Sequence, residues 1–210
     1  MGRVGKLFEI LELNNPNPKI ELDYINEYTL LVAVILSAQS TDKGVNRATG
    51  PLFNIVKSPE QMVNLGEEGL KQYIKSIGLF NSKAKNIMEM SKKLIRDFDS
   101  KVPDNLEDLM SLAGVGRKTA NVVLNSAFGK ATIGIDTHVL RLSNRLGLCD
   151  TKNVLHAEEQ LMHILPEKWA RKANHLLVLH GRYVCTARNP KCNECKIRDY
   201  CNFYITSLTK

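Results

Sequence analysis

Four cysteines near the C-terminus have the spacing of a metal-binding group. Cys185, Cys192, Cys195 and Cys201 form the pattern C-x6-C-x2-C-x5-C. In a reducing compartment, thiols this dense indicate a metal rather than disulfides. Zinc and iron–sulfur clusters both take four thiolates, but zinc sites usually have two close pairs. One close pair with two longer arms favours a cluster, while zinc and four unliganded thiols stay open. The fifth cysteine, Cys149, is predicted to be a buried apolar residue.

A glycine pair marks a second place where chemistry could occur. Gly114 and Gly116 lie one residue apart between two predicted short helices. Glycine lets the backbone adopt positive φ and approach a ligand closely. The first N–H groups of the following helix bind phosphate without reading base sequence. Because Arg117 and Lys118 follow directly, the segment favours a phosphate-binding helix–hairpin–helix over an ordinary turn.

Lys118 and Asp136 could take part in covalent chemistry. The helix dipole and the neighbouring Arg117 both disfavour the charged form of Lys118, and a neutral lysine amine forms imines. Asp136 precedes an apolar-periodic helix, where a carboxylate caps the helix. It could instead stabilise positive charge or activate a nucleophile. Residue chemistry alone favours a phosphate contact for Lys118 and a plain cap for Asp136 over these covalent roles.

The composition places the chain among globular proteins with an anionic partner. It has 210 residues, 43% of them hydrophobic and 24% charged, which excludes a disordered chain. A net charge of +7 favours nucleic acid as the partner, and a basic enzyme without a polyanion stays open. The longest apolar run, residues 30–36, is far shorter than a membrane span, and no apolar core follows Arg3 and Lys6 as in a signal peptide. We therefore expect a soluble cytoplasmic protein.

Apolar periodicity and helix-end signals predict an all-α fold. The expected helices cover residues 7–13, 27–38, 58–64, 67–77, 82–97, 106–112, 117–128, 137–146, 153–164 and 171–181. In the helix over 82–97 the predicted buried stripe is Ala84, Ile87, Met88, Met90, Leu94 and Ile95. No repeat is evident, and no linker marks a simple cut into two domains.

Several motifs together resemble the endonuclease III branch of the helix–hairpin–helix DNA glycosylases. The resemblance runs from about Lys6 to Cys201, and the four-cysteine spacing is that of the family's [4Fe–4S] loop. The other motifs are LSAQSTD (36–42), IGLFNSKA (77–84), GVGRKTANVVL (114–124), DTH (136–138) and LHGRY (179–183). One departure is Ala113, where the family usually has proline before the hairpin. This change should loosen the turn slightly without touching the chemistry.

The resemblance implies an all-α fold of two domains with a DNA cleft between them. A six-helix domain over residues 20–131 would carry the hairpin, and residues 1–19 with 132–210 would form a discontinuous domain with the cluster loop. The implied partner is double-stranded DNA that contains oxidised pyrimidines or abasic sites. The implied protein is a monomer in the bacterial cytoplasm, associated with the nucleoid through DNA.

The resemblance also implies roles for individual residues. Lys118 would be the Schiff-base nucleophile and Asp136 the catalytic carboxylate, and the four cysteines would hold a [4Fe–4S] cluster. Gln39 and Leu79 would fill the gap left by an extruded nucleotide, although residue chemistry alone makes them a helix-end polar residue and a core leucine. The further expected DNA contacts are Gly114, Gly116, Arg117, His138, Arg188 and Lys191. A solvated charged loop is the alternative for Arg188 and Lys191.

Three other interpretations compete with this one. An adenine-mismatch glycosylase of the same superfamily usually lacks a lysine at position 118 and carries an extra C-terminal domain, whereas nine residues follow Cys201 here. An electron-carrying iron–sulfur protein would need neither the hairpin nor Lys118. A non-catalytic DNA-binding module would not need Lys118 together with Asp136.

Overall fold

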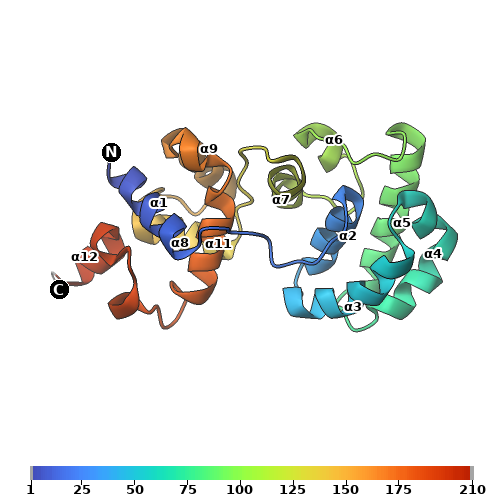
Figure 1. Cartoon of the computed structure of the whole chain (residues 1–210), viewed down its shortest axis with the longest axis horizontal. Helices are drawn as coiled ribbons and strands as arrows, with labels where there is room; N and C mark the ends of the chain where they lie inside the picture. Colours follow the sequence, from blue (N-terminus) through green and yellow to red (C-terminus); the bar gives the residue numbers. More distant parts are fainter. Residues whose placement is uncertain (1, 209–210) are drawn as a thin grey trace. The chain divides into compact units, whose positions relative to one another are not determined.

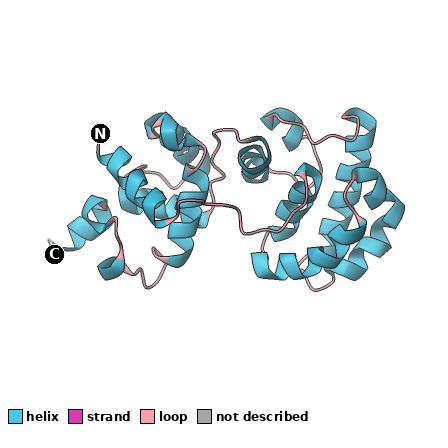
Figure 2. Ribbon diagram, viewed as in Figure 1, coloured by secondary structure: helices cyan, strands magenta, loops and turns pink. Residues whose placement is uncertain are grey.

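The computed structural model describes residues 2–208, and within that range every regular element is a helix and no strand occurs (Figure 2). The α-helices, labelled as in Figure 1, are α1 (Arg3–Asn14), α2 (Glu27–Ser37), α3 (Asp42–Ile55), α4 (Pro59–Ile74), α5 (Phe80–Asp97), α6 (Leu106–Met110), α7 (Arg117–Phe128), α8 (Thr137–Leu146), α9 (Val154–Ile164), α10 (Glu167–Ala170), α11 (Ala173–Tyr183) and α12 (Asn202–Leu208). The all-α prediction is confirmed. Over the described residues, no helix combines the length and the apolar character that a membrane span requires.

The chain forms two compact units. Glu21–Phe128 is one unit, called here the inserted unit because the chain leaves the other unit to form it and then returns. The other, called the split unit, comprises Met1–Ile20 and Gly129–Lys210 in their described parts. Helices α2 to α7 therefore belong to the inserted unit, and α1 with α8 to α12 belongs to the split unit.

Helix α2 forms the core of the inserted unit. Every residue from Tyr28 to Leu36 is buried, because α3, α5 and α7 all pack against this helix. Its first turn is closed by a capping box, in which the Asn26 side chain accepts from the Thr29 N–H at 2.9 Å and Thr29 Oγ1 accepts from the Asn26 N–H at 2.9 Å. A continuously apolar helix of this kind is stable only inside a protein, so α2 fixes the places of its neighbours.

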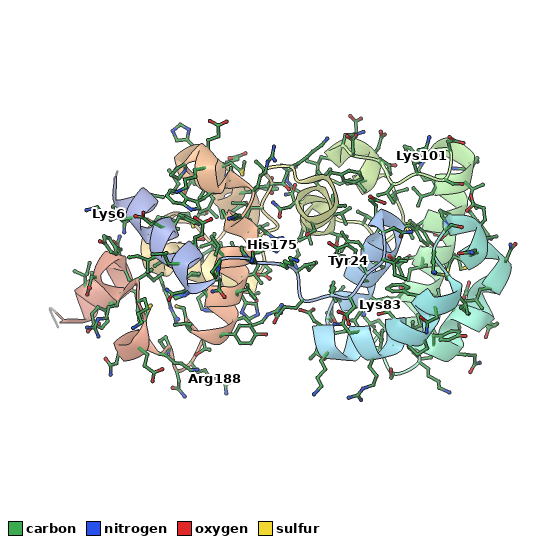
Figure 3. The ribbon with its side chains drawn as sticks, in the orientation of Figure 1. Lys6, Tyr24, Lys83, Lys101, His175 and Arg188 are labelled. Carbon is green, nitrogen blue, oxygen red and sulfur yellow. The ribbon has the colours of Figure 1, made fainter. Side chains whose placement is uncertain are left out.

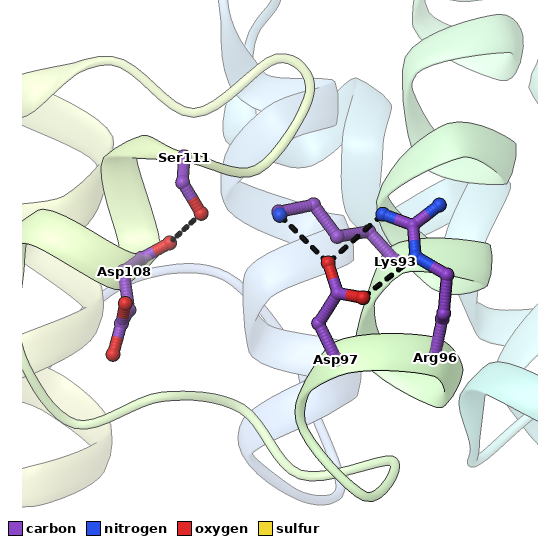
Figure 4. A network of polar contacts seen from close by, with 5 residues as sticks. All are labelled: Lys93, Arg96, Asp97, Asp108 and Ser111. Atoms are coloured by element: carbon purple, nitrogen blue, oxygen red, sulfur yellow. Dashed lines mark hydrogen bonds and ion pairs between the residues drawn. The ribbon is translucent and has the colours of Figure 1, made fainter.

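Helix α5 packs one apolar face against α2 and α4 and keeps charges on the other. The predicted buried stripe is confirmed except at Ile95, which is 37% exposed. Ile95 lies about 100° around the helix from Leu94 and is at the edge of the buried face, so it is only partly covered. At the end of α5, Asp97 accepts hydrogen bonds from Arg96 Nε at 2.6 Å and Lys93 Nζ at 2.8 Å (Figure 4). These two cations hold the pKa of Asp97 well below its usual range.

Helices α6 and α7 pack against each other at the glycine pair. Asn105 caps α6 by accepting from the Asp108 N–H at 2.9 Å, and Ser111 Oγ donates to the Asp108 carbonyl at 2.7 Å at the other end of the helix (Figure 4). These local bonds stabilise a helix too short to form by itself. The two bonds thus fix both ends of α6, the helix that precedes the glycine pair.

The split unit is built around α8 and α11, which pack against each other. Helix α1 packs on α11 through Leu7, Phe8 and Leu11, and α12 packs on α8. The Phe8 ring stacks on the Trp169 ring with centroids 6.3 Å apart. The N-terminal helix is therefore an integral part of the core formed by the C-terminal third of the chain.

Three helices were not predicted, and several predicted helices differ in extent; α1, expected over 7–13, covers Arg3–Asn14. Residues 42–55 look like a loop because Gly44, Gly50 and Pro51 are weak helix formers, yet α3 includes all three. Packing against α2 and α4 outweighs that propensity. The short α10 and α12 also lacked a clear signal. The two predicted helices over 58–77 are the two parts of α4, which breaks at Gly66 with φ of 75° and ends at Ile74.

A hydrogen bond and an ion pair to Glu12, at a partly buried position, join α1 to the segment that contains Trp169 and Lys172. One carboxylate oxygen of Glu12 accepts from Trp169 Nε1 at 2.8 Å, and the other forms an ion pair with Lys172. The hydrogen bonds from Lys172 and then from Trp169 lower the pKa of Glu12. The carboxylate thus contributes stability that is present above its unfolded-state pKa and is lost as the pH falls through the folded-state pKa.

We predict that Glu12→Gln lowers the free energy of unfolding at neutral pH by about 1 kcal/mol, because a charged acceptor is lost at a half-exposed position. The difference from the original protein should shrink once the pH falls below 4.5, the ordinary pKa of the group. Urea unfolding at a series of pH values measures both effects. Glu9→Gln, at an exposed position of the same helix, is the control and should be nearly neutral. A difference that stays constant down to acid pH would contradict the assignment.

Candidate functional site

The four clustered cysteines line one pocket in the split unit. Cys185 follows α11, Cys192 is the first residue of a 3-10 turn that Cys195 follows, and Cys201 precedes α12. All four are free thiols, and the other walls of the pocket are mostly apolar. Among the described residues, no group of three or more His, Cys, Asp or Glu side chains could hold a single metal ion. Four soft donors spread around an apolar pocket fit an iron–sulfur cluster better than one zinc ion.

Two arginines on α8 hold the first part of the cysteine loop. Arg141 Nη2 donates to the carbonyls of Gly181 at 2.6 Å and Cys185 at 2.9 Å. One turn later, Arg145 donates to the Thr186 carbonyl at 2.7 Å and to Cys185 Sγ at 3.3 Å. The sequence analysis missed both residues, although their i, i+4 spacing on a predicted helix places them on one face.

Burial shifts the protonation of the groups around the pocket. Burial lowers the pKa of His180 to about 4, so this side chain is neutral at pH 7. Its Nε2 lies 3.5 Å from Cys195 Sγ. Burial also raises the pKa of the Cys195 and Cys201 thiols. Metal binding displaces such protons, so a cluster in this pocket would bind in competition with them.

The loop between the first two cysteines carries exposed positive charge. Arg188 and Lys191 are both exposed, and Arg188 lies on the outside of the loop (Figure 3). The Lys191 N–H donates to the Val184 carbonyl at 3.0 Å, which anchors the second end of the loop next to α11. The structure thus fixes the loop backbone and leaves the two cations at the surface.

The hairpin has the conformation that its glycines indicated. Gly114 adopts φ of 79°, and a Cβ at this position would lie 3.0 Å from the Cβ of Asn86. A Cβ on Gly116 would meet nothing within 4 Å. Glycine is therefore required at 114 by the fold, whereas Gly116 presents bare backbone at the surface. Arg117 and Lys118 are exposed in the first turn of α7.

Asp136 is the N-cap of α8. Its Oδ1 accepts from the backbone N–H groups of His138 and Val139, both at 2.8 Å. Helix α11 approaches His138 closely because residue 181 is glycine, where a Cβ would lie 3.0 Å from the His138 carbonyl oxygen. The predicted cap is confirmed, and its two hydrogen bonds hold the carboxylate in one orientation at the start of α8.

Gln39 and Leu79 share an unusual backbone conformation. Both have positive φ, 55° at Gln39 and 58° at Leu79, and neither is glycine. Leu79 is 61% exposed, so the interpretation of this residue as a core leucine is wrong. Strained backbone at exposed residues of this kind is found at functional sites.

The predicted site residues divide between the two units. The cysteines, Arg188, Lys191, Asp136 and His138 belong to the split unit. The other predicted residues, Gln39, Leu79, Gly114, Gly116, Arg117 and Lys118, belong to the inserted unit. Each unit therefore carries its own set of candidate groups at helix ends and loops.

This combination defines a class of protein. An all-helical fold, a helix–hairpin–helix with cations behind it, and four thiols in one loop are the features of a DNA repair protein with an iron–sulfur loop. Residues 32–171 match the family described as "HhH-GPD superfamily base excision DNA repair protein". Residues 185–201 match the "Iron-sulfur binding domain of endonuclease III".

Within this class, the chain is similar in sequence and structure to endonuclease III proteins. The chain is 53% identical over 206 residues to endonuclease III of Rickettsia prowazekii, covering 98% of this chain and 97% of that protein. It is 48% identical to endonuclease III of Escherichia coli K12, with 92% of both chains covered. A solved structure of a trapped endonuclease III–DNA covalent intermediate is 38% identical with a TM-score of 0.90, covering 99% of each chain.

The chain belongs to the endonuclease III family. It is a DNA glycosylase with abasic-site lyase activity, and its C-terminal loop is the family's iron–sulfur domain. The resemblance inferred from the motifs is thereby confirmed, together with double-stranded DNA as the partner. The roles of individual residues stay predictions.

We predict that substitution of the two hairpin glycines affects different properties, stability at Gly114 and DNA binding at Gly116. Gly114→Ala should lower the free energy of unfolding by about 1–2 kcal/mol, because alanine disfavours positive φ and its Cβ would press on Asn86. Gly116→Ala should leave stability within about 0.5 kcal/mol and weaken binding to duplex DNA, because a methyl group would stand where phosphate approaches. Urea unfolding and a DNA titration measure the pair. Unchanged DNA affinity in Gly116→Ala would contradict a phosphate contact at this backbone.

Proposed function

We propose that this protein removes oxidised pyrimidines, such as thymine glycol, from double-stranded DNA and then cleaves the strand 3′ to the lesion through an imine on Lys118. One observation carries the proposal. The chain has an exposed lysine, Lys118, directly after its hairpin. It also aligns along 99% of its length with an endonuclease III that was trapped in covalent linkage to DNA. The bacterial relatives fit a cytoplasmic, nucleoid-associated enzyme, and the two compact units would be the family's two domains.

The first step is extrusion of the damaged nucleotide. A base within the stack is out of reach, and flipping it out costs a few kcal/mol, least for a damaged base. Gln39 and Leu79 would fill the space that the nucleotide leaves. Gly114, Gly116 and Arg117 would hold the phosphates beside it through the hairpin backbone and a cation.

The second step breaks the bond between base and sugar. The neutral amine of Lys118 attacks C1′, the base leaves with the bonding electron pair, and positive charge develops on the sugar. Asp136 would stabilise that charge, because its carboxylate is held in place by two backbone N–H groups. The amine loses a proton, the C1′–O4′ bond breaks and O4′ takes up a proton, which leaves an imine between C1′ and Lys118. Loss of a C2′ proton then forms the C2′–C3′ double bond as the 3′ phosphate leaves.

The cysteine loop would act through binding rather than bond breaking. Cys185, Cys192, Cys195 and Cys201 would hold the [4Fe–4S] cluster, which supplies a rigid centre for the loop. Arg188 and Lys191 would contact phosphates from the exposed face of that loop, and His138 would contact DNA from the first turn of α8. Such contacts weaken as salt concentration rises. The protein would act as a monomer.

We predict that Lys118→Gln loses the borohydride-trapped protein–DNA adduct on a duplex with one thymine glycol but still binds that duplex. Glutamine keeps the side-chain length and cannot form an imine. Gel analysis of trapped adducts and a DNA titration measure the two properties. Lys92→Gln, at an exposed position of α5, is the control and should trap normally. An adduct of normal yield in Lys118→Gln would rule out Lys118. Base release without any adduct in the original protein would indicate a glycosylase that lacks the lyase step.

We predict that Asp136→Asn keeps the fold and loses at least about a hundredfold in single-turnover base release. Asparagine caps helices as well as aspartate does, so α8 keeps its first turn. Asp136→Ala serves as the comparison, since it removes the cap as well and should also cost about 1 kcal/mol of stability. Rapid-quench kinetics and urea unfolding separate the two roles. Base release near the original rate in Asp136→Asn would leave Asp136 as a cap only.

A further inference from the structure

Lys83 is a buried cation whose partners are uncharged. The side chain lies on α5 in the inserted unit (Figure 3), and the residue is 5% exposed. Its Nζ donates to the carbonyls of Leu36 at 2.9 Å and Ala38 at 2.6 Å, and to Ser40 Oγ at 3.0 Å. An ammonium group has three N–H donors, so each donor has an oxygen acceptor.

These acceptors lie at the C-terminal end of α2. The last carbonyls of a helix lack intrahelical partners and carry the negative end of the helix dipole. In many helices a glycine after the last turn allows backbone N–H groups to bind the final carbonyls. Here the Lys83 ammonium group binds the Leu36 and Ala38 carbonyls instead. The residue after the Ala38 cap is Gln39, which adopts φ of 55° without being glycine. Burial lowers the pKa of Lys83, so the charge is kept in this place against a desolvation cost.

The same lysine also belongs to the turn that carries Leu79. The backbone N–H of Lys83 donates to the Leu79 carbonyl at 3.0 Å and closes the first turn of α5. Gly78 lies against the other loop, since a Cβ on it would be 3.9 Å from the Gln39 carbonyl oxygen. Lys83 thus binds the residues on both sides of Gln39 with its side chain and holds Leu79 with its backbone.

We propose that Lys83 is a positioning residue that holds Gln39 and Leu79 together in their strained conformations, so that both side chains enter the duplex as one rigid wedge. The inference rests on the proposed function, in which these two residues fill the space of the extruded nucleotide. The geometry assigns Lys83 no contact with DNA, because its ammonium group is already saturated inside the protein.

The test compares two substrates that differ in how much a wedge is needed. Both contain thymine glycol, one in a fully paired duplex and the other in a short bubble of mismatches, where the lesion is already unpaired. Lys83→Met should slow single-turnover base release from the paired duplex by about tenfold or more, because flipping there costs most. On the bubble, its rate should stay within about twofold of the original. The chemical groups are untouched, so borohydride trapping on the bubble should be normal.

A matched control accounts for the lost charge. Lys85→Met removes the same charge from the same helix, but Lys85 is exposed and pairs with Glu89 at 3.9 Å. This variant should behave as the original protein on both substrates. Equal slowing of Lys83→Met on paired duplex and bubble would overturn the inference, and so would no slowing on either.

Coupling between residues gives a second measurement. If Lys83 acts through Gln39, the double variant Lys83→Met, Gln39→Ala should be no slower on the paired duplex than the slower single variant, within about twofold. Independent, multiplying effects would overturn the inference. Base release by the original protein from neither substrate would instead overturn the proposed function, and this inference with it.

A milder substitution covers the case in which Lys83→Met does not fold. Ser40→Ala removes one of the three acceptors at a half-buried position and leaves the lysine in place. It should show the same dependence on substrate, with slowing of about threefold on the paired duplex. A rate unchanged on the paired duplex, or lowered equally on both substrates, would count against Lys83 as the positioning residue.

Discussion

A loop that carries four thiols has too little apolar surface to hold its own shape, and the split unit is organised around that constraint. Between Cys185 and Cys201, only Ile197 and Cys201 are buried. Helix α8 therefore supplies what the loop lacks, with Arg141 and Arg145 binding its carbonyls one helical turn apart. Asp136 caps the same helix, so one rigid element fixes both the carboxylate and the cysteine loop.

The candidate functional side chains are held in place by different kinds of interaction in the two units. In the split unit, functional groups are fixed by favourable interactions, such as the two N–H groups at Asp136. In the inserted unit, Gln39 and Leu79 are held against their backbone preference, and a buried charge helps to hold them. Strain of this kind persists only where the surrounding packing over-determines the conformation, and the buried helix α2 provides that packing.

Much of this arrangement could be predicted from residue types and spacing. Helix α7 has the predicted bounds, Gly114 has positive φ, and Asp136 caps α8, because each follows from local backbone chemistry. Helix α3 was missed because its glycines and proline give no local signal, and tertiary packing decides its conformation. Lys83, Arg141 and Arg145 were missed for a related reason. Most of their partners are backbone carbonyls, as many as 47 residues away, and sequence patterns do not record such pairings.

The split unit also sets the order in which a growing chain can mature. Helix α1 is made first, but Phe8 stacks on Trp169, and the rest of its apolar face packs on α11. The inserted unit is complete in the chain once Phe128 has been synthesised, and domains generally fold as they emerge. Helix α1 must wait, with Leu7, Phe8 and Leu11 uncovered, until the chain has been synthesised through α11. All four clustered cysteines follow α11 in the chain, so iron can be loaded only after both units' helices through α11 have been synthesised.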